Sequence, residues 1–376
     1  MDWKIPLFKI YWDEEDVRSV TESIKLGMYW TEGPNVGDFE KRVSEYIGTK
    51  YCVSFNSGTS ALHSSLISYD IKKGDEVIVP SFTFIATANA PLFVGAKPVF
   101  ADIEENTFGL NPEDVNEKIT NKTKAIIPVH YGGCPCNINA LKEIAEDNNL
   151  ILIEDAAEAF GAKIGKEKIG TFGDSSMFSF CQNKIITTGE GGAITTNSKD
   201  IYHKLRLIHS QGRSETKNYF FSTNTADYVN LGYNFRMSNI IASLGLSQIS
   251  KADKLIEQRR YNSKYMDSKL KGHNIKLINP PKDYFNVYQL YTIRVDRHLR
   301  KKLMDYLEKK GIMTKIYFYP IHKTHFYNNV LGYKCNLEIT EKISEEVLTL
   351  PMFPSLEKSE INMISSEIKK FLMENE

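Results

Sequence analysis

Hydrophobic and polar residues follow two different patterns along the chain, and the change comes at Tyr51. Before it, apolar residues recur at helical spacing in two runs that stop at Gly27 and Gly48, which predicts two amphipathic helices. Their apolar faces carry Val17, Val20 and Ile24 in the first run and Val36, Phe39, Val43 and Ile47 in the second.

After Tyr51, short apolar runs alternate with helical stretches. The runs with strand character are Tyr51–Phe55, Glu76–Val79, Pro98–Ala101, Ala125–Val129, Leu150–Ile153, Met177–Phe180 and Ala193–Thr195. Most of these runs are continuously apolar, which is typical of strands covered on both faces. The alternation of strands and helices predicts an α/β fold with a largely parallel sheet.

The C-terminal third of the chain has a different texture. A polar-rich helical stretch at Leu246–Leu270 is expected to link to a second domain. The elements expected beyond it are a strand at Leu290–Val295, a helix near His298–Lys309, a strand at Lys315–Phe318 and a final amphipathic helix with Ile361, Ile364, Ile368 and Phe371 on one face. We therefore expect a large domain at residues 1–250, including the N-terminal segment, and a smaller α+β domain at residues 251–376.

Composition narrows the class of protein. The chain has 376 residues, and 47 basic residues balance 47 acidic ones, so nothing suggests a nucleic acid or an anionic membrane as partner. No apolar run approaches the roughly 18 residues of a membrane span, and the N-terminus lacks a signal-peptide pattern. The spacing Cys134-Pro-Cys136 fits neither a zinc knuckle nor a CxxC pair. We expect a cytoplasmic protein with reduced thiols and no metal.

A turn of small residues follows the first predicted strand. It reads NSGTS at residues 56–60 and opens a helical run. Such a turn offers free backbone N–H groups and the positive end of a helix dipole, which together bind phosphate. The turn lacks the Gly-Lys-Ser/Thr pattern of a Walker loop, and an ordinary capped turn is the alternative.

Two charged residues and an aromatic follow other strands. Asp155 ends its strand where a carboxylate could keep a pyridine nitrogen protonated, with a helix N-cap as the alternative. Lys184 lies between an apolar strand and the glycine-rich TTGEGG, where a desolvated amine could form a Schiff base, although a lone loop lysine is more often exposed. After the second strand, Phe82 or Phe84 could stack on a flat ring, although either one alone would more often be core. In this fixed order, phosphate turn, aromatic, carboxylate and lysine predict a site for pyridoxal 5'-phosphate (PLP).

Six segments carry a resemblance to a known family. They are SGTSALHSSL, VIVPSFTFIATANA, GAKPVFADIE, IEDAAEAFGA, FSFCQNKIITTGEGGAITT and LGYNFRMSNIIASLGLSQI. They are similar to segments of the sugar aminotransferases of the DegT/DnrJ/EryC1/StrS group, and the resemblance covers essentially the whole chain. It implies a PLP-dependent transferase of fold type I: a large, mostly parallel mixed sheet flanked by helices, a small C-terminal domain, and a homodimer with active sites at the interface.

The resemblance implies a role for each matched residue. Lys184 would form the Schiff base and move protons, Asp155 would pair with the pyridine nitrogen, and Glu158 would reach the side of the ring hydroxyl. The other implied contacts are Phe84 on the ring face, Gly58, Thr59 and Ser179 at the phosphate, and Asn234 of the partner subunit at the same phosphate. Arg236 is left without a role.

Two departures from many relatives stand beside the lysine. Ile185 replaces a common Asn, and Cys181-Gln182 replaces His-Pro or a similar pair. Neither position carries the central chemistry, so both bear on substrate fit. Some members of the group have histidine in place of the lysine and act as dehydratases, and Lys184 therefore favours transamination.

The expected amino donor is L-glutamate. The expected acceptor is a nucleotide-linked 4-keto-6-deoxy sugar, because the IPL start and the segment GMYWTEGPNV look more like the C4-aminating, perosamine-synthase-like branch. His322 is expected to face the sugar, with a satisfied loop histidine as the alternative. Three other functions stay open: amination of a 3-keto sugar nucleotide, another PLP reaction on the same fold, and ligand binding without catalysis.

Overall fold

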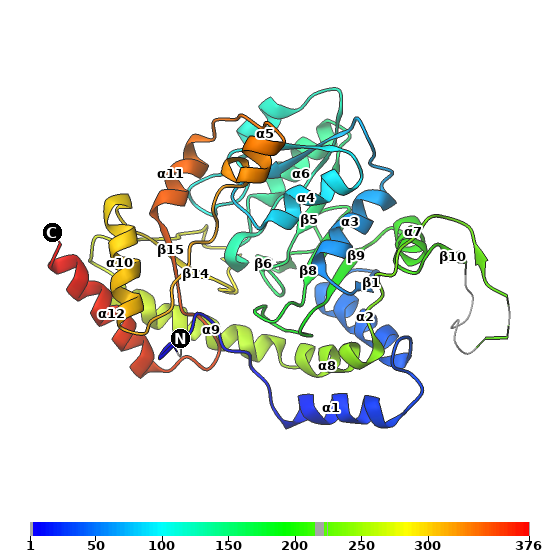
Figure 1. The fold of residues 1–376 in the computed structure, drawn as a ribbon, viewed down its shortest axis with the longest axis horizontal. Coiled ribbons are helices and arrows are strands. Elements are labelled where there is room, and N and C mark those ends of the chain that lie inside the picture. The colour runs from blue at the N-terminus through cyan, green and yellow to red at the C-terminus, as the bar shows by residue number, and fades with distance from the viewer. Residues whose placement is uncertain (1–2, 215–221, 224, 376) are drawn as a thin grey trace.

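The computed structural model describes residues 3–214, 222–223 and 225–375 (Figure 1). Within them, a sheet has the strand order β1-β9-β8-β5-β4-β2-β3. Its strands are β1 Tyr51–Phe55, β2 Glu76–Pro80, β3 Lys97–Ala101, β4 Thr123–Ile126, β5 Ile151–Asp155, β8 Ser175–Ser179 and β9 Gly192–Thr196. Neighbours from β3 to β8 pair in parallel, and β9 pairs antiparallel with both β8 and β1. The α/β class and all seven predicted strands are confirmed.

Helices cover both faces of this sheet (Figure 1). Side chains of α2, α6 and α8 belong to the hydrophobic cluster on one face, and those of α3, α4 and α7 to the cluster on the other. The helices are α1 Glu14–Lys25, α2 Pro34–Ile47, α3 Gly58–Ser68, α4 Ile85–Phe93, α5 Pro112–Lys118, α6 Ile138–Asp147, α7 Lys199–His209, α8 Asn239–Ile249, α9 Ala252–Leu270, α10 Arg297–Lys309, α11 Glu338–Glu346 and α12 Lys358–Met373. Two faces buried by helices explain why the strands are continuously apolar.

A second, smaller sheet lies in the C-terminal part of the chain. It has the order β12-β14-β15 and packs with α9, α10 and α12 around a hydrophobic cluster of its own. Its strands are β12 Lys276–Leu277, β14 Tyr291–Arg294 and β15 Val347–Leu350. The N-terminal end of the chain joins this part, because Ile5 forms a parallel bridge with Ile312. The remaining strands are short: β6 Lys163–Ile164, β7 Glu167–Lys168, β10 Arg213–Ser214, β11 Asp227–Tyr228 and β13 Tyr284–Phe285.

Two expectations about the C-terminal third are wrong. The segment Lys315–Phe318 is not a strand: Lys315 bridges to Thr349, and the chain then leaves the sheet, because the hydroxyl of Tyr131 donates to the carbonyl of Tyr317 at 2.6 Å. The helical stretch Leu246–Leu270 is two helices, α8 and α9, separated at Ser250 and Lys251. The strand β14, the helix α10 and the final helix α12 are confirmed.

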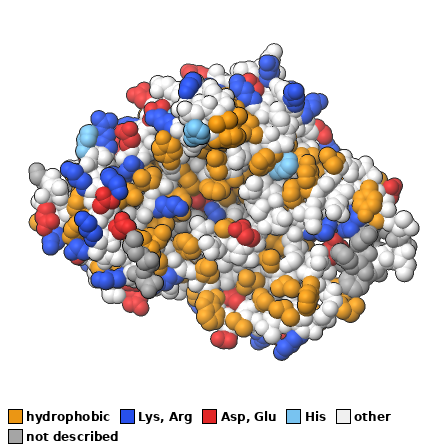
Figure 2. All heavy atoms as spheres, viewed as in Figure 1, with side chains coloured by type: hydrophobic (Ala, Val, Ile, Leu, Met, Phe, Trp, Pro, Cys, Tyr) orange, Lys and Arg blue, Asp and Glu red, His pale blue; other side chains and the backbone are white. Residues whose placement is uncertain are grey.

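Helix α1 forms as predicted but turns its apolar residues outward. Asp16 and Ser23 are its buried residues, whereas Val17 and Ile24 are 48% and 45% exposed. Hydrophobic side chains accordingly gather on the surface around α1 in Figure 2. Among the helices of the described ranges, none has the length and apolar composition needed to cross a bilayer.

Candidate active site

The predicted site residues meet at one edge of the large sheet. Asp155 is the last residue of β5, and Ser179 is the last residue of β8. These strands are parallel neighbours, so their carboxyl ends lie side by side. Gly58 begins α3 directly after β1, which is linked to β8 through β9. In open α/β sheets, ligands bind at this edge.

The amine of Lys184 lies against a carboxylate. Its Nζ is 3.6 Å from Oε1 of Glu158, and the two side chains are only 14% and 9% exposed. The other oxygen, Oε2, accepts the backbone N–H of Gly132 at 2.8 Å. The loop that carries the lysine is held from the C-terminal part of the chain, where Gln289 donates to the carbonyl of Asn183 at 2.5 Å. At 3.6 Å the contact is longer than a direct hydrogen bond, although few waters compete for a pair this buried.

Asp155 is buried and hydrogen-bonded at both oxygens. Its side chain is 4% exposed, Oδ2 accepts the hydroxyl of Thr87 at 2.8 Å, and Oδ1 accepts the N–H of Ala157 at 3.1 Å. Burial raises the pKa of Asp155; the bonds from Thr87 and Ala157 and the charge of Lys184 oppose that rise, and the charge of Glu158 adds to it. A buried carboxylate of this kind suits a cationic partner such as a protonated ring nitrogen.

The small-residue turn places a helix N-terminus directly on the end of β8. A Cβ added at Gly58 would lie 3.2 Å from both Met177 Sδ and Ser179 Cβ, so with a larger residue these neighbours would have to shift by a few tenths of an ångström. Ser57 caps the helix through the N–H of Ser60. The first N–H groups of a helix have no acceptor within it, so those of Gly58 and Thr59 are available to an anion.

Two further predicted contacts lie at the rim of this edge. Phe84 is the N-cap of α4 and is 60% exposed, one turn before Thr87. Asn234 is exposed, and its carbonyl accepts the side-chain amide of Asn56 at 3.4 Å, beside the turn of its own chain. Both residues are therefore near the proposed cofactor position without being buried in the core.

His322 is buried and already has partners at both ring nitrogens. Its side chain is 4% exposed, Nδ1 lies 2.7 Å from Ser81 Oγ, and Nε2 lies 3.3 Å from Glu341 Oε1. Burial lowers the pKa of His322, although Glu341 opposes that shift. This geometry favours the alternative given above, a satisfied loop histidine, here supporting the loop that leads to Phe84. The site proposed below therefore does not include His322.

No role is predicted from the sequence for Thr87, Gly132 or Gln289, which contact Asp155, Glu158 and the lysine loop. Thr87 lies within the quoted segment VIVPSFTFIATANA, but a threonine in a helix carries no local signal for such a contact. Within the described residues, no group of three or more His, Cys, Asp or Glu side chains is arranged to hold a metal.

Fold and site together define a class, the PLP-dependent transferases. The chain belongs to the DegT/DnrJ/EryC1/StrS aminotransferase family, whose sequence profile matches residues 11–369. It is 36% identical to the GDP-perosamine synthase of Escherichia coli O157:H7 over 98% of each chain. These similarities show a sugar aminotransferase with PLP as cofactor, and they confirm the resemblance, the fold type and the cofactor expected from the sequence.

Solved structures agree with this assignment. The chain superimposes with a TM-score of 0.92 on Helicobacter pylori PseC, an aminotransferase involved in the biosynthesis of pseudoaminic acid, at 28% identity and over 98% of this chain and 99% of that one. The PLP-form of the putative sugar aminotransferase Spr1654 from Streptococcus pneumoniae gives the same TM-score, identity and coverage.

Proposed function

We propose that the protein transfers the amino group of L-glutamate to C4 of a nucleotide-linked 4-keto-6-deoxy sugar. The observation that carries the chemistry is the buried cluster in which Lys184 lies 3.6 Å from Glu158, beside Asp155. Two relatives, from Escherichia coli O157:H7 and Vibrio cholerae, are named GDP-perosamine synthase and are 36% and 34% identical. They support a GDP-linked acceptor and the branch indicated by the segment GMYWTEGPNV.

Three parts of the site would hold PLP. The first turn of α3 would take the phosphate at the N–H groups of Gly58 and Thr59, with the hydroxyl of Ser179 beside them. The carboxylate of Asp155 would face the ring nitrogen, and Phe84 would cover one ring face. When bound, PLP supplies an aldehyde that takes up an amino group and a ring that stores the electron pair of the neighbouring carbon.

Lys184 would carry out the proton transfers. Its Nζ removes the proton from the α-carbon of glutamate in the first half-reaction and delivers a proton to C4 of the sugar in the second. Glu158 holds the ammonium form of this side chain, and the N–H of Gly132 fixes Glu158 in turn. The burial of both side chains keeps water from competing for the proton.

Assays with defined substrates test the donor and the acceptor. The purified protein is incubated with L-glutamate and with GDP-, UDP- or dTDP-linked 4-keto-6-deoxy sugars, and the products are followed by mass spectrometry and NMR. We expect 2-oxoglutarate and a 4-amino sugar in equal amounts. Turnover of 3-keto sugars alone would overturn the C4 assignment. If glutamate leaves the visible absorption of the holoenzyme unchanged while another amino acid bleaches it, the donor is wrong.

We also propose that the protein works as a homodimer in which Asn234 serves the site of the other subunit. The exposure of its side chain supports a contact outside its own chain. The test co-expresses a Lys184→Ala subunit with an Asn234→Asp subunit under two affinity tags. A contact across the interface leaves one intact site in each mixed dimer, so activity returns. A contact within the chain leaves both sites damaged, and no activity would return.

A further inference from the structure

Thr87 is a buried hydroxyl residue of α4 that contacts the end of β5. Its side chain is 1% exposed, and Oγ1 lies 2.8 Å from Oδ2 of Asp155. Phe84, the residue proposed for the ring face, caps the same helix one turn earlier. One helix therefore carries both the residue over the proposed ring face and the residue that touches the partner proposed for the ring nitrogen.

The hydrogen-bond direction in this group is fixed by chemistry. The N–H of Ala157 can only donate, so Oδ1 of Asp155 accepts at 3.1 Å. An ionised carboxylate accepts at both oxygens, so the hydroxyl of Thr87 donates to Oδ2. The hydroxyl of Thr83, 3.3 Å from that of Thr87, is then free to donate to Thr87. Each carboxylate oxygen of Asp155 is therefore held by one donor, the hydroxyl of Thr87 or the N–H of Ala157, and the contact of Thr83 with Thr87 lies outside this pair.

We propose that Thr87 is a positioning residue whose hydroxyl holds Asp155 as an ionised, fixed acceptor for the ring nitrogen of PLP. This inference rests on the proposed function, because it takes the role of Asp155 from there. Burial raises the pKa of Asp155 and favours its neutral form, whereas the bond from Thr87 lowers it. Without that hydroxyl, a buried carboxylate would lose one of its two donors and could both rotate and take up a proton.

The test compares hydroxyl variants by two measurements on the full-length holoenzyme. Equilibrium dialysis against a series of PLP concentrations gives the dissociation constant, and the absorption spectrum reports the state of the bound ring. Thr87→Val removes the hydroxyl at nearly constant shape, and Thr87→Ser keeps it. Thr83→Val is the matched control, because it removes the neighbouring hydroxyl and leaves the bond from Thr87 to Asp155 in place.

We expect Thr87→Val to weaken PLP binding by about tenfold, because the loss of a hydrogen bond to a charged group lowers affinity by about that factor. The absorption spectrum should change as well. Thr87→Ser should restore both values, and Thr83→Val should stay close to the parent protein. Thr87→Ala is measured as well, so that a folding defect in the valine variant does not decide the result. Parent-like binding and spectrum in either variant without the hydroxyl would overturn the inference.

Asp155→Asn separates this inference from the function on which it rests. If that variant binds PLP as the parent does, the role proposed for Asp155 is wrong, and the role of Thr87 falls with it. If Asp155→Asn is impaired while Thr87→Val and Thr87→Ala are not, the proposed function stands and only the role of Thr87 is wrong.

Discussion

Two clusters in the molecule are built alike and are used differently. In each, two carboxylates three positions apart in sequence lie near one lysine from a distant element. The α1 cluster is Asp13, Asp16 and Lys251, and the site cluster is Asp155, Glu158 and Lys184.

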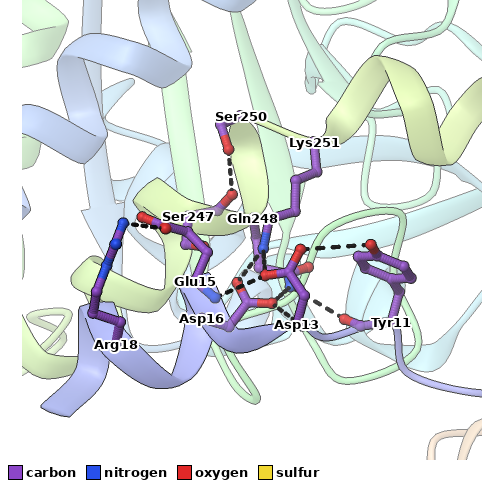
Figure 3. A network of polar contacts seen from close by, with 9 residues as sticks. All are labelled: Tyr11, Asp13, Glu15, Asp16, Arg18, Ser247, Gln248, Ser250 and Lys251. Carbon is purple, nitrogen blue, oxygen red and sulfur yellow. Dashed lines mark hydrogen bonds and ion pairs between the residues drawn. The ribbon is translucent and has the colours of Figure 1, made fainter.

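In the α1 cluster, the lysine is paired with both carboxylates (Figure 3). We call such a cluster closed. Lys251 pairs with Asp13 and also with Asp16, at 3.0 Å, while Gln248 donates to the other oxygen of Asp16 at 3.0 Å. Both aspartates also form the capping box of α1. The lysine amine is paired with both carboxylates. The cluster therefore has a structural role, because it links α1 to the break between α8 and α9.

The site cluster is open by comparison. In the described part of the chain, the amine of Lys184 lies within 4 Å of one carboxylate group, that of Glu158, at 3.6 Å. Asp155 takes its hydrogen bonds from Thr87 and Ala157 instead of from the lysine. A lysine between two carboxylates is therefore not by itself a functional signal. A lysine whose amine is buried but loosely paired is the one able to leave its partner and react.

The largest expected effect is the difference in turnover between variants of the two lysines, Lys184 and Lys251. Lys184→Ala should lower turnover by about 10⁴-fold, because it removes the group that moves protons. Lys251→Met should keep the turnover rate within about threefold, because electrostatic changes at a distance from the chemistry are screened. Steady-state rates of both purified variants check this. Comparable losses in the two variants would mean that the clusters do not differ as described.

The next largest effect is the difference in turnover between variants of two carboxylates, Asp155 and Asp16. Asp155→Asn should slow turnover by about a hundredfold, since the ring nitrogen loses its anionic partner. Asp16→Asn should leave turnover near that of the parent and lower the thermal midpoint, because Asp16 is 3% exposed and would no longer neutralise Lys251. Parallel measurements of rate and thermal midpoint check both claims, and the reverse assignment of effects would contradict them.

A smaller effect is the contribution of the α1 cluster to the stability of the fold. Lys251→Met should lower the free energy of unfolding by about 2 kcal/mol, because it leaves Asp16 buried beside a single side-chain donor, Gln248. Lys41→Met is a matched control, since Lys41 is 72% exposed and pairs with Glu45 only at 3.9 Å. Denaturant unfolding of the three proteins gives the comparison. Equal stability of the two variants would remove the structural role of the α1 cluster.

The sequence predicted most of the fold because the strands are set by local apolar runs. It could not predict where tertiary contacts interrupt a local pattern. The helical pattern of the sequence continues through Lys251, yet the helix is interrupted there, where Lys251 pairs with Asp13 and Asp16. The apolar residues of α1 were found, but not that its buried face would be polar, because that face is selected by partners more than 200 positions away.

The candidate site divides in the same way. Lys184 and Asp155 could be proposed because each follows a recognisable strand, and parallel neighbours bring their carboxyl ends together. Their roles stay predictions. The contact of Thr87 with Asp155 and the burial of both nitrogens of His322 against Ser81 and Glu341 depend on how distant elements pack, and no spacing rule gives them.

The smallest expected effect is a change of stability with pH, and its direction is opposite in the two clusters. Lys251 lowers the pKa of Asp13, whose ordinary value is 3.8, so the stability from that carboxylate is present above this value and is lost as pH falls through the folded-state pKa. Burial raises the pKa of Asp155 in the cofactor-free protein, so its contribution is present below the ordinary value and is lost as pH rises through the folded-state pKa.

Thermal midpoints of the cofactor-free, full-length protein from neutral to acid pH check these signs. The gap between the parent protein and Lys251→Met should close as the solution is acidified, because the parent loses the Asp13 contribution that the variant never had. The parent should gain stability relative to Asp155→Asn over the same range, because only the parent can take up the proton that burial favours. If both gaps change in the same direction, the two carboxylates share one electrostatic environment, and the distinction between a closed and an open cluster fails.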